Sequence, residues 1–199
     1  RELSAVLAHF GISRWDVLMF GDGSGWDWKI GCGWGCVVID GATLARKLLG
    51  GVWSQGTVGI AELMPYLQGL MWYHAAVGKK RRPGRGGRLT EVHVICDNET
   101  VVRQGNRQCG KDALAPLWAG IDQVIRQGYY VRWHWTERDQ IGLNALVDLV
   151  SKFYRILAKN LTLTDMMPDF PNMSVYDVNP YLTTGISHDQ ATDTPVRHS

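Results

Sequence analysis

Apolar and polar positions alternate along the chain with periods that change from segment to segment. Residues 3–10 carry apolar side chains at helical spacing, so we expect a short leading helix or linker over 1–14. Three aliphatic and aromatic runs of strand length follow, with Asp40-Gly41 as a turn between the second and the third. These runs cover residues 15–22, 32–40 and 43–54. The first quarter of the chain therefore predicts a three-strand meander.

A longer helical pattern begins near Gly59 and ends near Val77, with its apolar side chains on one stripe. Thr57 is placed to cap this helix, and Pro65 is expected near its first turn, where proline is tolerated. The later elements are a Gly/Arg/Lys-rich segment over 78–88, a strand over 91–97, helices over 98–105 and 112–127, a strand over 129–135 and an amphipathic helix over 142–159. The order β-β-β-α-β-α-α-β-α predicts an α/β fold.

The segment 160–199 has a different composition from the rest of the chain. It is rich in Pro, Asp, Thr, Ser and Asn and shows no sustained period. We therefore expect one domain over 15–159 followed by an extended or partly ordered C-terminal tail.

Composition changes this picture little. With 45% apolar and 20% charged residues, a chain of 199 residues can form an ordinary core. The formal net charge of +2 is a weak argument for a nucleic-acid partner. Four cysteines lack zinc-like spacing, which favours buried thiols in the cytoplasm or another reducing intracellular compartment, not a secreted protein. No apolar run reaches the length of a membrane span, and the start at Arg1 suggests a piece of a longer polypeptide.

Four acidic residues stand at four different predicted elements. Asp22 ends the first strand run and Asp97 ends the fourth, while Glu62 begins the first long helix and Asp148 lies in the last one. Carboxylates brought together by a fold are the oxygen ligands that Mg²⁺ prefers, and Mn²⁺ uses similar ligands. Two such ions a few ångströms apart can hydrolyse a phosphodiester. The set therefore predicts a metal-dependent site.

Each acid also has a simpler interpretation. Asp22 before Gly-Ser-Gly suits a turn, Glu62 suits the first turn of a helix, and Asp97-Asn98 suits a helix cap. Asp148 suits a solvated helix face, and Asp139 competes with it for the fourth place. Asp27 and Asp40 are interpreted as loop acids. Only the four acids taken together favour catalysis.

The motifs around these acids, in this order, resemble the ribonuclease H family over about residues 15–158. Asp22-Gly23-Ser24 matches the family's first-strand motif, and Ala61-Glu62-Leu63 matches the start of its first long helix. Asp97-Asn98 matches the end of the fourth strand. Asn144, followed four residues later by Asp148, matches the last helix. The resemblance implies a five-stranded mixed sheet flanked by helices, with the strand ends of Asp22 and Asp97 adjacent.

The resemblance also implies an activity, namely endonucleolytic hydrolysis of the RNA strand of RNA–DNA hybrids with two Mg²⁺ ions, or Mn²⁺ in their place. Asp22 would bridge both ions, Glu62 and Asp97 would share one, and Asp148 would help to hold the other. The residues expected to contact the substrate are Gly23, Ser24, Thr57, Asn98, Arg138, Asn144 and the basic residues Lys79, Lys80, Arg81 and Arg82.

The residues expected to select the substrate differ from those of the family. Where family members have Thr-Asn-Asn before the catalytic Glu, this chain has Thr57-Val58-Gly59, which weakens the case for a hybrid. A family histidine before the last helix has no match, because His134 falls too early and is interpreted as structural. Two alternatives remain. One is a related nuclease that acts on another substrate, such as branched DNA. The other is a non-catalytic nucleic-acid-binding domain of a larger polyprotein.

Basic and aromatic residues add two expectations. The segment 79–88 holds six cations in ten residues, so it suits phosphate binding, or a solvated loop directed away from the metals. Trp26, Trp28 and Trp34 follow Asp22 closely and can stack on bases or sugars. The tryptophans expected in the core are Trp72, Trp118, Trp133 and Trp135.

Overall fold

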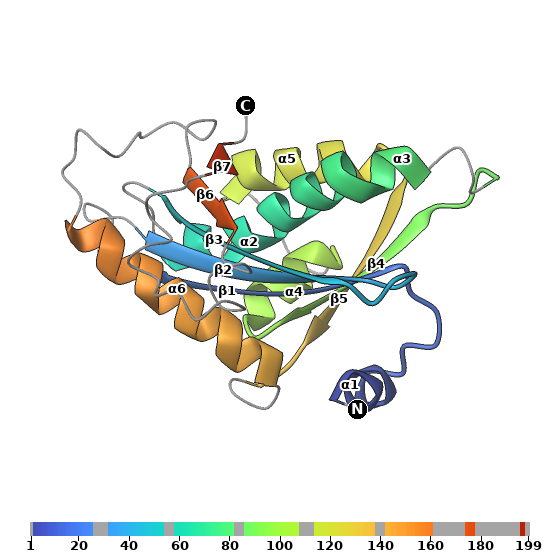
Figure 1. Ribbon diagram of the computed structural model, residues 1–199, viewed down its shortest axis with the longest axis horizontal. Helices are drawn as coiled ribbons and strands as arrows, with labels where there is room; N and C mark the ends of the chain where they lie inside the picture. The colour runs from blue at the N-terminus through green and yellow to red at the C-terminus, as the bar shows by residue number, and fades with distance from the viewer. Residues whose placement is uncertain are drawn as a thin grey trace.

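A computed structural model shows the fold of the chain (Figure 1). It describes residues 2–25, 32–53, 58–81, 86–107, 114–137, 142–160, 174–177 and 196–197. The predictions for Thr57, Arg82, Arg138, Asp139 and the tryptophans at 26 and 28 lie outside these residues.

A single mixed sheet forms the centre of the molecule, with strand order β5-β4-β1-β2-β3-β6-β7. Its strands are β1 (Val17–Gly25), β2 (Cys32–Asp40), β3 (Arg46–Trp53), β4 (Thr90–Cys96), β5 (Tyr129–Trp135), β6 (Ser174–Asp177) and β7 (Val196–Arg197). Strands β1, β2 and β3 form the predicted antiparallel meander, whereas β4 pairs in parallel with both β1 and β5. The predicted five-stranded core is confirmed, and two short strands from the tail extend it at the β3 edge.

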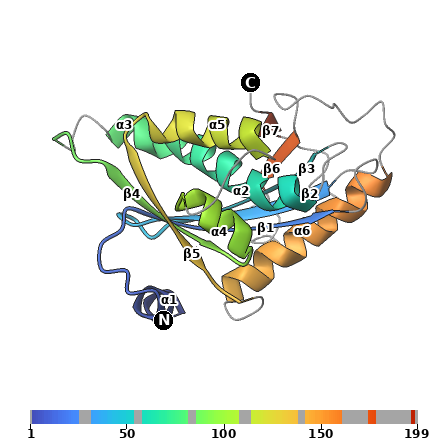
Figure 2. The ribbon, with the colours of Figure 1, turned by 180° about the vertical axis from the view of Figure 1, so that it is seen from behind.

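Helices cover both faces of this sheet. They are α1 (Glu2–His9), α2 (Val58–Tyr73), α4 (Glu99–Gly105), α5 (Ala115–Ile125) and α6 (Gly142–Asn160). Figures 1 and 2 show α2 and α5 on one side of the sheet and α6 on the other. The helix α2 continues into a π-helical turn, η1 (His74–Gly78), and a last turn, α3 (Lys79–Arg81), so the basic segment begins as helix rather than loop.

Alternating side chains of the central strands build two separate cores. Val17 and Met19 of β1 pack with α2, α4 and α5, whereas Leu18 and Phe20 pack with α1 and α6. All four side chains are fully buried, as expected for a strand covered on both faces. This alternation decides which helix each later residue of β1 meets.

Two local predictions need correction. Pro65 lies in the interior of α2 and not near its first turn. Asp40 is not a loop acid, because it is the buried last residue of β2. Among the cysteines, Cys32, Cys36 and Cys96 are buried, as predicted, and Cys109 lies outside the described residues. None of the helices in the described part of the chain is both long and apolar enough to cross a bilayer.

Candidate active site

Asp22 is a buried carboxylate near the middle of the sheet. It follows Leu18 and Phe20 at two-residue spacing, so its side chain lies on the α6 face of β1. Only 5% of the residue is exposed. A carboxylate in this position is deprived of water and depends on its neighbours for its charge state.

The parallel pairing of β1 with β4 brings Asp97 close to Asp22. Phe20 is in register with Ile95, and each acid stands two residues beyond its member of this pair. Adjacent strands lie about 4.8 Å apart, so two carboxylates at equivalent positions approach each other. The predicted adjacency of Asp22 and Asp97 is thus present in the structure, although β1 does not end at Asp22 as predicted but continues to Gly25.

Glycine at position 23 lets the helix α2 reach the same strand. A methyl group at Gly23 would overlap the backbone of Ala61 and crowd the amide of Glu62. The Tyr66 hydroxyl, one turn later, donates a hydrogen bond to the Gly21 carbonyl at 2.8 Å. These contacts fix the start of α2, and with it Glu62, beside the end of β1.

Glycines in β2 likewise allow the helix α6 to pack closely on the sheet. Gly35 is the register partner of Asp22, and a Cβ there would lie 2.9 Å from the Val147 carbonyl. A Cβ at Gly33 would overlap the backbone of Ser151 and Arg155. The helix therefore packs directly on the sheet backbone, which carries Asp148 to Asp22.

The pKa of Asp22 reflects its burial and the nearby acidic residues. Burial, the charge of Asp97 and a hydrogen bond with Asp148 together raise the pKa of Asp22 to about 9, against a lowering by the Gly23 amide. These surroundings therefore oppose the ionisation of Asp22, and its carboxyl group makes a hydrogen bond with that of Asp148. Asp22 and Asp148 are thus in direct contact, and Asp97 is near enough for its charge to act on Asp22.

Glu62 and Asp148 also contact polar side chains of neighbouring residues. The Asn98 Nδ2 donates a hydrogen bond to Glu62 Oε2, and Lys152 Nζ lies 2.8 Å from Asp148 Oδ2. Over the described residues, no three His, Cys, Asp or Glu side chains have the spacing of a ready metal-ligand cluster. The four predicted acids are gathered in one region, but two of them are held in other contacts.

The predicted substrate-binding residues have varied surroundings. Asn98 is also the N-cap of α4, with its Oδ1 accepting from the Val101 amide at 3.0 Å. Asn144 is buried one helical turn before Asp148, and neither of its amide atoms has a hydrogen-bond partner among the described residues. Ser24 lies at the half-buried end of β1, and Lys79 and Lys80 are exposed.

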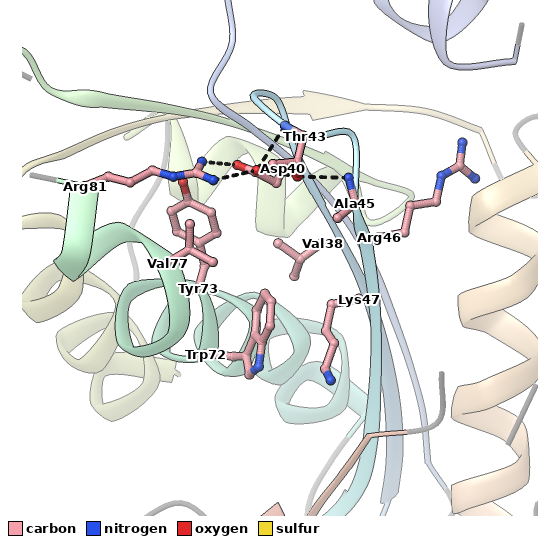
Figure 3. Close-up of a pocket in the computed structure, with 10 residues that line it drawn as sticks. All are labelled: Val38, Asp40, Thr43, Ala45, Arg46, Lys47, Trp72, Tyr73, Val77 and Arg81. Atoms are coloured by element: carbon pink, nitrogen blue, oxygen red, sulfur yellow. Dashed lines mark hydrogen bonds and ion pairs between the residues drawn. The ribbon is translucent and has the colours of Figure 1, made fainter. Parts of the chain in front are cut away.

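Arg81 lies at a second place, far from the carboxylates. Its guanidinium binds both oxygens of Asp40, at 2.5 and 3.0 Å, beside a cavity of about 290 Å³. Figure 3 shows the cavity between β3 and α2, with Lys47 lying along Trp72. Asp40 pairs with Val17, five residues before Asp22, which is roughly 17 Å along the strand. The cavity therefore belongs to a different end and face of the sheet.

Sequence reasoning missed or misplaced several residues near the site. Trp34 is fully buried against α2 and cannot stack on a ligand. Trp135 was assigned to the core, yet it is 43% exposed, with its indole N–H donating to the Asp97 carbonyl. In the sequence, only the i,i+4 spacing of Lys152 from Asp148 indicates that the two side chains could form an ion pair. His134 lies nearly parallel to His93, with His93 Nδ1 2.8 Å from His134 Nε2, which agrees with the structural interpretation of this residue.

Comparison with known proteins settles the fold. No protein-family model and no curated protein matches the chain. Among solved structures, the N-terminal RNase H domain of rv2228c from Mycobacterium tuberculosis matches 72% of this chain and 96% of its own, with a TM-score of 0.56 and 20% identity. The chain has a ribonuclease H-like fold. At such identity the likeness concerns the fold alone.

Two further structures show the range of proteins that share the ribonuclease H-like fold. LC11-RNase H1, solved in complex with an RNA/DNA hybrid, is 18% identical, with a TM-score of 0.52, over 71% of this chain and 98% of its own. The protease-reverse transcriptase of prototype foamy virus is 15% identical, with a TM-score of 0.51, over 72% of this chain and 21% of its own. The ribonuclease H-like fold thus occurs both in separate enzymes and within a much longer chain.

Proposed function

We propose that the chain is a metal-dependent endonuclease that hydrolyses the RNA strand of RNA–DNA hybrids. The observation that carries this proposal is the meeting of Asp22, Asp97 and Asp148 from β1, the end of β4 and α6. A fold does not gather carboxylates in a buried place for stability, because their mutual repulsion and desolvation are unfavourable. Perturbed carboxyl groups in such clusters mark functional sites.

The donor set fits Mg²⁺ or Mn²⁺. These groups are carboxyl oxygens, the ligands of hard divalent cations, and a cation would offset the burial and the charge repulsion that together raise the pKa of Asp22. Asp22, Asp97, Asp148 and Glu62 are the residues that would hold such ions. When bound, a pair of ions would supply an activated water and stabilise the leaving oxygen of the phosphodiester.

Neighbouring side chains have supporting roles in this proposal. Asn98 orients Glu62 through Nδ2 while its Oδ1 caps α4, so the carboxylate is tied to a fixed helix end. Tyr66 holds the backbone of β1 next to Asp22. The buried amide of Asn144 offers a donor and an acceptor to a water or a substrate group beside Asp148.

The hybrid substrate is supported by the likeness to LC11-RNase H1, whose structure contains an RNA/DNA hybrid. The exposed Lys79 and Lys80 suit contacts with phosphates away from the cleavage point. The contacts of Glu62 and Asp148 with Asn98 and Lys152 favour one second candidate, a domain that binds nucleic acid without cutting it.

A substrate panel tests the proposal. The chain is incubated with an RNA–DNA hybrid, duplex RNA, duplex DNA and a four-way junction, each with Mg²⁺, Mn²⁺ or EDTA. We expect cation-dependent cutting of the RNA strand of the hybrid, with a loss of about 100- to 1,000-fold in Asp22→Asn. Asp122→Asn on the outer helix α5 is the matched control. Hybrid binding without cutting would select the second candidate, and full activity of Asp22→Asn would refute the proposed site.

A further inference from the structure

Lys152 occupies a particular place beside the carboxylate cluster. It lies one helical turn after Asp148 on α6, with its Nζ 2.8 Å from Asp148 Oδ2. The Lys152 side chain is 50% exposed and that of Asp148 is 19% exposed, so the lysine approaches from solvent while the carboxylate faces the interior. The same Asp148 also makes a hydrogen bond with Asp22.

We infer that Lys152 is an exchangeable counter-ion that competes with the divalent cation for Asp148. This inference rests on the proposed function. An ammonium group and a divalent cation on the same carboxylate repel each other, so each weakens the binding of the other. The long lysine side chain can rotate into solvent without disturbing α6, so the exchange needs no change in the backbone.

The strength of the ion pair between Lys152 and Asp148 sets the size of the expected change in cation affinity. A half-exposed ion pair is worth at most about 1 kcal/mol, which corresponds to a factor of about five in a binding constant. Removing the ammonium group should therefore tighten divalent-cation binding by about two- to fivefold. Because the pair is partly exposed, high salt screens it, and the difference between wild type and variant should shrink as ionic strength rises.

Manganese binding measured without substrate tests the inference. Free Mn²⁺ is followed by its electron paramagnetic resonance signal during titration of the wild type, Lys152→Met and Lys152→Arg. Lys152→Met keeps much of the side-chain length and removes the charge, whereas Lys152→Arg keeps the pair. Arg126→Ala, which removes an exposed cation at the end of α5, controls for the overall charge of the molecule.

Tighter binding in Lys152→Met, with Lys152→Arg and Arg126→Ala close to the wild type, is the expected result. Equal affinity in all four proteins would overturn the inference and leave the nuclease proposal standing. No Mn²⁺ binding by the wild type would overturn both. Lys152→Ala provides a second variant that lacks the charge. An effect caused by the methionine side chain itself would be seen in Lys152→Met but not in Lys152→Ala.

Discussion

The raised pKa of Asp22 gives a quantitative prediction about folding stability. In the unfolded chain this carboxyl group has a pKa near 3.8, and in the folded protein burial and the nearby Asp97 and Asp148 raise it to about 9. Between these two values the folded state binds a proton that the unfolded state releases. Stability from this group is therefore complete below pH 3.8 and is lost as the pH rises toward 9.

The magnitude follows from the width of that interval. Each pH unit between the two pKa values costs at most about 1.4 kcal/mol, so from pH 5 to pH 8 the loss is at most about 4 kcal/mol. Asp22→Asn keeps the size of the side chain and removes the titration. We expect the unfolding free energy of the wild type to fall with pH relative to this variant, so that the variant becomes the more stable protein at pH 8.

Urea unfolding in EDTA, followed by circular dichroism at pH 5, 6, 7 and 8, measures this difference. Asp122→Asn on α5 serves as the control and should follow the wild type. Excess Mg²⁺ should reduce the slope, because a bound cation favours the ionised carboxylate. A difference between wild type and Asp22→Asn that stays constant from pH 5 to pH 8 would refute the assigned proton and the crowding of the three acids.

Three further predictions follow from packing and charge. Gly23→Ala should destabilise the fold by about 3 kcal/mol in urea unfolding, because the new methyl group overlaps the backbone of Ala61. Burial acts to raise the pKa of Asp40, but the Arg81 guanidinium outweighs it and lowers that pKa, so Asp40→Asn should cost about 1 kcal/mol at pH 7 and almost nothing at pH 2. Burial chiefly lowers the pKa of His134 to about 4, so its folded form resists protonation, and from pH 6.5 to pH 4 the thermal stability of the wild type should fall relative to that of His134→Gln.

Each of these predictions has an internal control. Gly120→Ala should be nearly neutral, since its Cβ meets only the flexible end of Leu67 at 3.1 Å. Arg81→Ala should lose the same pH-dependent stability as the Asp40 variant. In His134→Gln the acid-dependent fall should be smaller than in the wild type. Similar losses in both glycine variants, or an Asp40 effect that persists at pH 2, would contradict the packing and the ion pair.

Local patterns in the sequence were sufficient for the core of the fold. An apolar run predicted β2 and alternation predicted β5 to the residue, and the acids that end two apolar runs identified the region where Asp22 and Asp97 approach each other. These features are local, because an apolar run and the acid that ends it lie within ten residues. The resemblance to a known family then supplied the strand order, which periodicity alone does not give.

Other features depend on contacts between distant segments. The contact of Lys152 with Asp148 beside Asp22 arises from how closely α6 approaches the glycines of β2, and no pattern within α6 encodes that distance. Trp135 is exposed because it ends the edge strand β5, a position unknown until the sheet order is known. The sequence of β6 shows no strand period, because pairing with the free edge of β3, and not its own side chains, decides its conformation.

The pairing of β6 with β3 has a consequence for how the protein is made. Leu49 pairs with Asp177, so the outer edge of β3 stays unpaired until the segment 174–177, far later in the chain, has left the ribosome. Until then its backbone amide and carbonyl groups are open to another copy of the same strand, and assembly of such a distant pair is slow. A fragment that ends near residue 160 should therefore keep the carboxylate cluster and yet be prone to self-association through β3.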